Sequence, residues 1–343
     1  RWGEDGLAGY SDDKQRLCFS LALWNGVDPI LKERLFGLTN SEGNHGEDVK
    51  EYYFYIDSTP THSYMKYLYK YPQREYPYGN LVETNRRRSR TEFEYELIDT
   101  GVFDDNRYFD VFVEYAKAGP EDILIKISAH NRGPQTAELH VLPTLWFRNR
   151  WSWQSGVERP SLNQIGSSGV IKAFDQEMGE RYFYCDGDVP LLFTENETNT
   201  QRIFGAPNRN PYVKDGINNY VVAGERGAVN PERRGTKASA HYHLSVGPGE
   251  AKIVRLRLSP VALSPTNGGS AFGKGFEDIV EARRREADEY YGALTPASFT
   301  ADQANVMRQA LAGMLWSKQF FFFDGDNWLD EHNSNPLHSG YLN

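Results

Sequence analysis

The sequence has little cysteine and no surplus of basic charge. Its 343 residues include two cysteines, Cys18 and Cys185, so it lacks the disulfide framework of a small secreted domain. We expect both thiols to be buried and free, which favours a reducing, cytoplasmic location. Lys and Arg total 38 against 47 acidic residues, which gives a net charge of −9. Because nucleic-acid binding requires a basic surface, this composition argues against a nucleic-acid partner.

Long apolar runs are also missing. No segment approaches the roughly 20 residues that a membrane helix needs, so we expect no membrane partner. The chain begins at Arg1 with neither a starting methionine nor a signal peptide, and its last residues, 336–343, read as a loop. Both ends resemble the interior of an ordered protein. We therefore expect the chain to be an internal piece of a longer polypeptide.

Short runs of alternating apolar residues fill the chain as far as about residue 260. The odd-numbered positions of 109–115 fall on one strand face, and an alternating run at 123–127 precedes the turn 131–134 and a strand at 138–147. This order predicts a hairpin across the turn. Many strands and few helices predict a mostly β fold, an antiparallel β-sandwich (a supersandwich) over residues 1–262. Further strands are predicted near residues 15–24, 47–57, 94–103, 181–185, 219–223, 237–246 and 251–258.

The spacing of apolar residues becomes helical at about residue 276. Phe276 and Val280 lie on one face of a predicted helix, 276–292. A capping box over 300–303 predicts the start of a second helix, 301–320. We therefore divide the chain into a β-sandwich domain (1–262), a linker with a helix (263–298) and the first helix of an (α/α)6 helical barrel (299–343).

Motifs for phosphate and metal binding are incomplete. The glycine-rich run 268–275 resembles a P-loop, but Gly275 stands where magnesium binding needs a Ser or Thr hydroxyl. His241 and His243 share one face of a predicted strand and have the chemistry of metal ligands. No third ligand stands near them in the sequence. We expect neither a metal nor another cofactor.

Aromatic residues are abundant, at 14% of the chain. Nine tyrosines occur between residues 52 and 78, directly after a polar loop at 40–48. Buried phenols need hydrogen-bond partners, so this mixture suits either a polar domain interface or a sugar site. The segment 146–153 is a second cluster, of aromatic and basic residues, with the same two interpretations.

Several stretches of the chain resemble a known family. They are residues 1–6, the loop 43–48, the segment 57–64, the strand 142–149 and the helical stretch 314–320. These stretches resemble bacterial and fungal glucosidases that are related to glycoside hydrolase family 63, and the resemblance runs through nearly the whole chain.

The resemblance implies a β-sandwich, a linker helix and an (α/α)6 barrel that hydrolyses α-glucosidic bonds with inversion. In an inverting enzyme one carboxylic acid protonates the leaving oxygen, and a carboxylate on the opposite face activates water. Both carboxylates belong to the barrel in that family, so we expect the catalytic residues beyond Asn343 and assign none here. The implied partners are an oligosaccharide or small α-glucoside substrate and the chain's own C-terminal catalytic barrel.

Four residues are the best candidates for substrate contact or for shaping the mouth of the barrel. These are His62, Tyr64, Trp146 and Arg148. One alternative is a stand-alone carbohydrate-binding or interaction module without catalytic activity. A weaker alternative makes Glu47 and Asp48 an acid/base pair, although adjacent residues of a strand point to opposite faces.

Overall fold

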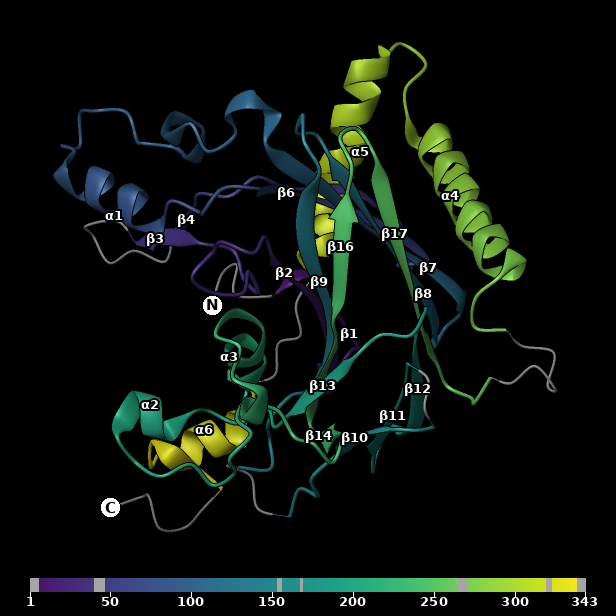
Figure 1. Ribbon diagram of the computed structural model, residues 1–343. Helices are drawn as coiled ribbons and strands as arrows, with labels where there is room; N and C mark the ends of the chain where they lie inside the picture. Colours follow the sequence, from purple (N-terminus) through teal and green to yellow (C-terminus); the bar gives the residue numbers. More distant parts are fainter. Residues whose placement is uncertain are drawn as a thin grey trace.

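The computed structural model describes residues 6–39, 47–152, 156–166, 169–263, 270–318 and 323–337. Within these residues, two antiparallel sheets face each other across a shared apolar core (Figure 1). The six-stranded sheet has the order β1 (Leu7–Ser11), β2 (Leu17–Trp24), β9 (Ala137–Phe147), β15 (Lys237–Ala240), β13 (Leu191–Thr194), with β16 (Tyr242–Val246) paired to β9. The nine-stranded sheet has the order β14 (Arg234–Gly235), β10 (Ser161–Gln164), β11 (Val170–Asp175), β12 (Gly179–Cys185), β17 (Ala251–Ser259), β8 (Asp122–Asn131), β7 (Tyr108–Gly119), β6 (Tyr64–Pro72), β5 (Tyr53–Ser58). A separate pair joins β3 (Gly37–Thr39) to β4 (Glu47–Val49).

Alternation along the strands builds the core between the sheets. Odd-numbered residues of β7 and β8, such as Val111, Val113 and Ile125, are almost fully buried there. Leu21 and Val141 meet them from the other sheet. Successive side chains of a strand point to opposite faces, so the alternation in the sequence predicted this face correctly. The β-sandwich is therefore the observed architecture of this part of the chain.

The turn at 131–134 does not close a hairpin, contrary to the expectation from the sequence. β8 pairs with β7 and β17, whereas β9 pairs with β2, β15 and β16 in the other sheet. The side-chain amide of Asn131 donates to the backbone oxygens of Gln135 and Val246, at 2.7 and 2.8 Å. These bonds fix a corner at which the chain changes sheets, a connection that has the same turn residues as a hairpin.

Two predicted strands are helical instead. Residues 219–223 belong to α3 (Gly216–Val222), where the apolar side chains of Ile217, Tyr220 and Val221 pack on the outer face of the six-stranded sheet. A short apolar run is compatible with a helix as well as with a strand, and here the packing against the six-stranded sheet stabilises the helix. Within 94–103 lies a 3-10 helix, Leu97–Thr100, which ends at Gly101 in the left-handed conformation.

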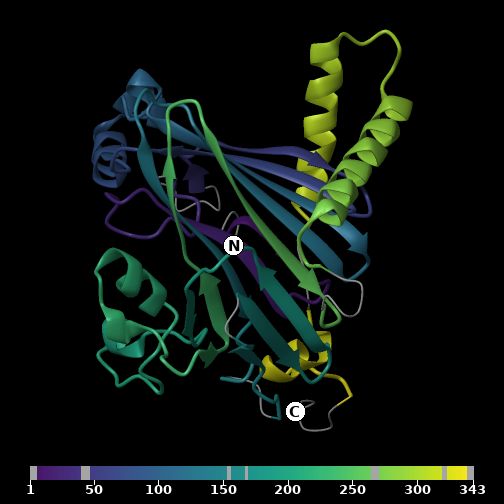
Figure 2. The same cartoon turned by 45° about the vertical axis from the view of Figure 1, so that its right-hand side comes forward.

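Two helices follow the sandwich, as the spacing predicted. α4 (Lys274–Leu294) packs on the outer face of the nine-stranded sheet, and α5 (Ala301–Trp316) packs on its inner face, where Trp316 meets the core. Figure 2 shows the two helices as a hairpin at one end of this sheet. The outer contact joins Phe276, Val280 and Ala287 of α4 to Tyr64, Ala116 and Leu124 of the sheet.

Shorter helices complete the described chain. They are α1 (Tyr78–Arg87), α2 (Thr200–Phe204) and α6 (Gly325–Glu331), with 3-10 turns at Asp104–Asn106 and Arg226–Ala228. An (α/α)6 barrel is not among the described residues and stays a prediction. No helix of the described ranges is both long and apolar enough to cross a membrane. Cys18 and Cys185 are buried and belong to no disulfide of the described residues, and burial raises the pKa of the Cys185 thiol.

Candidate functional site

The tyrosine-rich strands and α5 meet in an aromatic cluster, which we call the tyrosine seam: Tyr55, Tyr67, Tyr115 and Trp316. The indole of Trp316 stacks on Tyr55, with ring centroids 5.2 Å apart and planes 18° apart. It also contacts Tyr67 at 5.7 Å and Tyr115 at 6.1 Å. Its N–H donates to the backbone oxygen of Asp57 at 2.9 Å. Trp316 therefore anchors α5 to the sheet through both stacking and a hydrogen bond.

An ion-pair bridge fixes the same helix from the side. Arg308 of α5 binds the buried carboxylate of Asp57 in β5, and its other guanidinium nitrogen lies 2.7 Å from Asp288 of α4. Burial raises the pKa of Asp57, against the opposing effect of Arg308. The second carboxylate oxygen, Oδ1, is buried without a hydrogen-bond partner among the described residues. One guanidinium thus ties a strand and two helices together.

Tyr64 lies beneath α4 and is 1% exposed. Its hydroxyl donates to Glu114 at 2.6 Å, and Arg284 of α4 donates to the same carboxylate at 2.9 Å. Burial raises the pKa of Tyr64, while for Glu114 the bonds from Tyr64 and Arg284 outweigh burial and lower the pKa. A hydroxyl enclosed in this way holds α4 on the sheet. Its expected role in substrate contact or in shaping the mouth of the barrel stays a prediction.

His62 lies in the turn between β5 and β6, at the C-terminal end of α5. Its backbone has a left-handed φ of 52°, and its ring Nε2 lies 3.3 Å from the backbone oxygen of Leu315. The ring is half-buried, and burial lowers its pKa. The structure therefore brings His62 and Tyr64 together with the helices, each against a different one.

The opposite face of α5 is apolar and exposed within the described chain. Val306 is 61% exposed, Leu311 37% and Met314 75%. Tyr290 and Leu294 near the end of α4 are exposed as well. Large apolar side chains gathered on one helix face are typical of a surface that another element covers.

Trp146 and Arg148 lie on the other sheet. Trp146 is half-buried in β9, where its backbone pairs with Cys18 and Lys237. Arg148 follows the end of β9 and donates its backbone N–H to Arg16 at 2.9 Å. The four candidates from the sequence thus divide into two pairs on different sheets.

Beyond the end of β9 lies a polar cluster that sequence reasoning missed. Arg159 binds the carboxylates of both Glu195 and Glu197, at 2.6 and 3.1 Å. The indole N–H of Trp151 donates to Glu197 at 3.0 Å, and Thr236 donates to Glu195 at 2.7 Å. One guanidinium thus holds both carboxylates in place, and the three side chains together carry a net negative charge.

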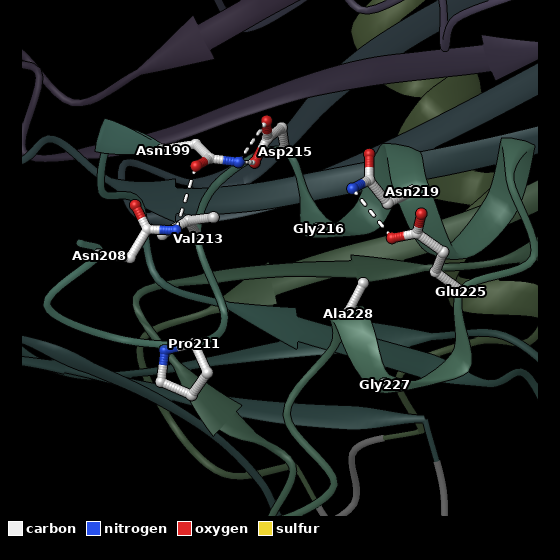
Figure 3. A pocket seen from close by; sticks show the side chains of 10 residues that line it. All are labelled: Asn199, Asn208, Pro211, Val213, Asp215, Gly216, Asn219, Glu225, Gly227 and Ala228. Carbon is white, nitrogen blue, oxygen red and sulfur yellow. Dashed lines mark hydrogen bonds between the residues drawn. The ribbon is translucent and has the colours of Figure 1, made fainter. Parts of the chain in front are cut away.

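A polar hollow follows this cluster along the chain, and we call it the asparagine groove. It is an open hollow of about 300 Å³ between the segment that carries α2 and the start of α3 (Figure 3). A second hollow of about 530 Å³ shares Asn208 and Pro211 with it. The first hollow is lined by Asn199, Asn208, Pro211, Val213, Asp215, Gly216, Asn219, Glu225, Gly227 and Ala228.

Hydrogen bonds between its own side chains shape the groove. Asn199 donates to both oxygens of Asp215, at 3.2 and 3.1 Å, and accepts from Asn208 at 3.1 Å. On the facing wall Asn219 donates to Glu225 at 3.1 Å (Figure 3). The signal in the sequence was the density of asparagine between residues 196 and 219, in a region read as plain loop and strand.

His241 and His243, which the sequence offers as possible metal ligands, lie beside a third histidine, His140. His140 of β9 lies across from His243, and its Nδ1 is 2.7 Å from Nε2 of His241. The rings of His140 and His243 are stacked, 4.1 Å apart and 12° from parallel, so their lone pairs do not converge. No group of three His, Cys, Asp or Glu side chains in the described part of the chain has the arrangement of a metal site.

Some predicted features lie outside the described residues. They are the loop 40–46, Trp153, and residues 268 and 269 of the glycine-rich run. Glu47 and Asp48 pair with Thr39 and Leu38 as neighbours in β4, and nothing further is described of their side chains.

The chain resembles a yeast protein along almost its whole length. No protein-family model matches. The uncharacterised protein YMR196W of Saccharomyces cerevisiae is 40% identical over 368 residues, which cover 96% of this chain and 34% of the yeast protein. The chain thus spans about a third of the length of that relative.

Among solved structures, a putative kojibiose phosphorylase from the human microbiome aligns with a TM-score of 0.30 and 9% identity, over 92% of this chain and 34% of that chain. A putative aldose 1-epimerase from Escherichia coli aligns with a TM-score of 0.27 and 9% identity, over 75% and 80% of the two chains. A galactose mutarotase related enzyme from Lactobacillus acidophilus aligns with a TM-score of 0.27 and 7% identity, over 73% and 96%.

Proposed function

We propose that this chain is the non-catalytic β-sandwich part of an inverting α-glucosidase-type glycoside hydrolase. In this role it packs against a helical catalytic barrel of the same polypeptide and shapes the entrance to the active site. The supporting observation is the position of α5. Trp316 anchors this helix in the tyrosine seam, while its opposite face presents Val306, Leu311 and Met314 to solvent.

The energetics of that exposed face favour a helical neighbour. Burying a side chain of this size contributes about 1.5–3 kcal/mol. Burial of Val306 and Met314, which lie along one stripe of the helix, would therefore contribute a few kcal/mol to the packing of a second helix. The spacing of Val306, Ala310 and Met314 is i, i+4 and i+8, which is the stripe that a parallel or antiparallel helix covers.

The contacts of α5 give the sandwich a positioning role in the proposed enzyme. Arg308 and Trp316 fix the helix along its length, and His62 meets its C-terminal end. A barrel that starts from α5 inherits this orientation. Misplacing catalytic groups by about 1 Å costs an enzyme roughly 100-fold in rate, so the anchoring residues would affect catalysis without touching substrate.

The proposed reaction assigns no chemical step to this chain. The acid and the base of the inverting mechanism would come from the barrel. The carboxylates of Glu195 and Glu197 are both bound to Arg159, and we assign neither of them to the acid or the base. We therefore expect the 343-residue chain by itself to be inactive on α-glucosides.

The test compares the complete polypeptide with the 343-residue chain. We expect the complete polypeptide to hydrolyse an α-linked glucose disaccharide and to release β-glucose first, as followed by proton NMR of the anomeric signals. The chain alone should show no turnover. The proposal fails if the complete polypeptide leaves α-linked glucosides intact, if it releases α-glucose first, or if the chain alone is active and loses activity in Glu47→Gln or Asp48→Asn.

A further inference from the structure

The asparagine groove is a built polar hollow that the proposed function leaves without a role. We propose that it is an auxiliary binding site for an α-linked glucose oligosaccharide, separate from the catalytic site. This inference goes beyond the proposed function and depends on it only for the choice of sugar. Its first hollow, of about 300 Å³, lies at the lower end of the range that ligand pockets occupy.

The shape of the groove suits an extended ligand with several rings. The two hollows share Asn208 and Pro211, so they are neighbouring parts of one depression. The larger part, about 530 Å³, opens beside α2. A single small molecule would fill one hollow, whereas a short oligosaccharide extends from one to the next.

The polar groups of the groove match the hydroxyls of a sugar. A hydroxyl donates one hydrogen bond and accepts others, and side-chain amides and carboxylates supply both kinds of partner. Glu225 receives its bond from Asn219 through one oxygen, and its other oxygen remains an acceptor. Asp215 already accepts from Asn199 and pairs with Arg202 at 3.0 Å, which holds it in place. The two carboxylates also make the groove unsuited to phosphate or another anion.

Close backbone contacts keep the walls of the groove in place before any ligand binds. A Cβ on Gly216 would lie 2.2 Å from the backbone oxygen of Ala228, so the start of α3 touches the opposite wall directly. A preformed site loses less entropy on binding than one that must be ordered.

One exposed aromatic residue is next in the sequence to the lining of the groove. Phe204 ends α2, is 72% exposed, and precedes Gly205, which lines the second hollow. Exposed aromatic faces stack on the apolar faces of sugar rings, so Phe204 is the candidate platform.

The experiment measures binding to the 343-residue chain by saturation-transfer difference NMR, with maltotriose and isomaltotriose as probes. We expect at least one trisaccharide to bind the unmodified chain. Glu225→Gln and Asn208→Ala should each weaken that binding about five- to tenfold, the effect of losing one or two hydrogen bonds. Phe204→Ala should weaken it similarly, and because this side chain is exposed the variant keeps its fold.

The matched control is Asn163→Ala in β10, whose amide bonds to Ser161 outside the groove. It should bind as the unmodified chain does, and circular dichroism should show the same fold for all variants. Two results would overturn the inference: no transfer from the chain to either trisaccharide, or equal binding by the groove variants. Because the assay needs no hydrolysis, failure here is distinct from failure of the hydrolysis test on the complete polypeptide.

Discussion

Replacing Trp316 by alanine removes the side chain that joins α5 to the nine-stranded sheet. The change deletes the stacking on Tyr55 and the contacts with Tyr67 and Tyr115, and it leaves the backbone oxygen of Asp57 without its indole donor. Truncating a buried aromatic residue to alanine costs about 3–5 kcal/mol. Trp316 is only half-buried in the described chain, so we expect a loss near the lower end of that range.

The loss should appear first as release of α5 rather than as unfolding of the sandwich. Trypsin cleaves after Arg308 and Lys318, and a docked helix resists this cleavage. We expect Trp316→Ala to be cut there at least tenfold faster than the unmodified chain, while Trp316→Phe, which keeps a ring but no donor, lies between them. The control is Trp328→Ala, in α6, which should leave cleavage at these sites unchanged. Equal protection of α5 in Trp316→Ala would refute the anchoring role of the seam.

Three further predictions concern charge. Burial and the neighbouring imidazoles lower the pKa of both His140 and His241 to about 4, so the unfolded chain binds more protons than the folded chain between pH 6.5 and 4. The free energy of unfolding, measured with urea, should therefore fall by about 1–3 kcal/mol as the pH falls across this window. His140→Gln should make this pH dependence weaker. Arg308→Gln should lower the free energy of unfolding by an amount near the lower end of the roughly 3–5 kcal/mol that breaking a buried ion pair costs. Adding Asp57→Asn should restore part of that loss. Equal stability of the single and double variants would contradict the ion pair between Arg308 and Asp57. In the complete polypeptide, Arg148→Ala should lower kcat/KM for an α-glucoside about tenfold without unfolding the protein, and wild-type kinetics would remove Arg148 from the candidates.

The sequence predicted the layers of this fold better than their connections. Alternation from Phe109 to Tyr115 assigned the buried face of β7, because a strand has one periodicity whatever sheet it joins. The turn at 131–134 was assigned to a hairpin, since turn residues do not encode which sheet receives the next strand. That choice depends on the contacts of Asn131 with Val246, which lie 115 residues apart.

The structure locates the candidate residues, whereas their roles stay predictions. The tyrosine-rich segment lies against α5 through the rings of Tyr55 and Tyr67, which contact Trp316, whereas the hydroxyl of Tyr64 has its partner in Glu114 beneath α4. Tyr64 was expected to be open to substrate or to shape the barrel mouth, and a single tyrosine in a sequence does not reveal whether its partner is Glu114 or solvent. The asparagine groove was not predicted from the sequence, because Asn199, Asn208 and Asp215 come together only in the folded chain.

The most direct test of the account is the accessibility of Met314 in the complete polypeptide. In the 343-residue chain this side chain is 75% exposed on the outer face of α5. Hydroxyl-radical footprinting with mass spectrometry measures its oxidation in both proteins, with the exposed Phe93 as the internal reference. If α5 is the first helix of a barrel that the sandwich supports, oxidation of Met314 should fall at least tenfold in the complete polypeptide while that of Phe93 stays the same. Equal oxidation of Met314 in the two proteins would contradict the proposal that this face docks on a helical domain.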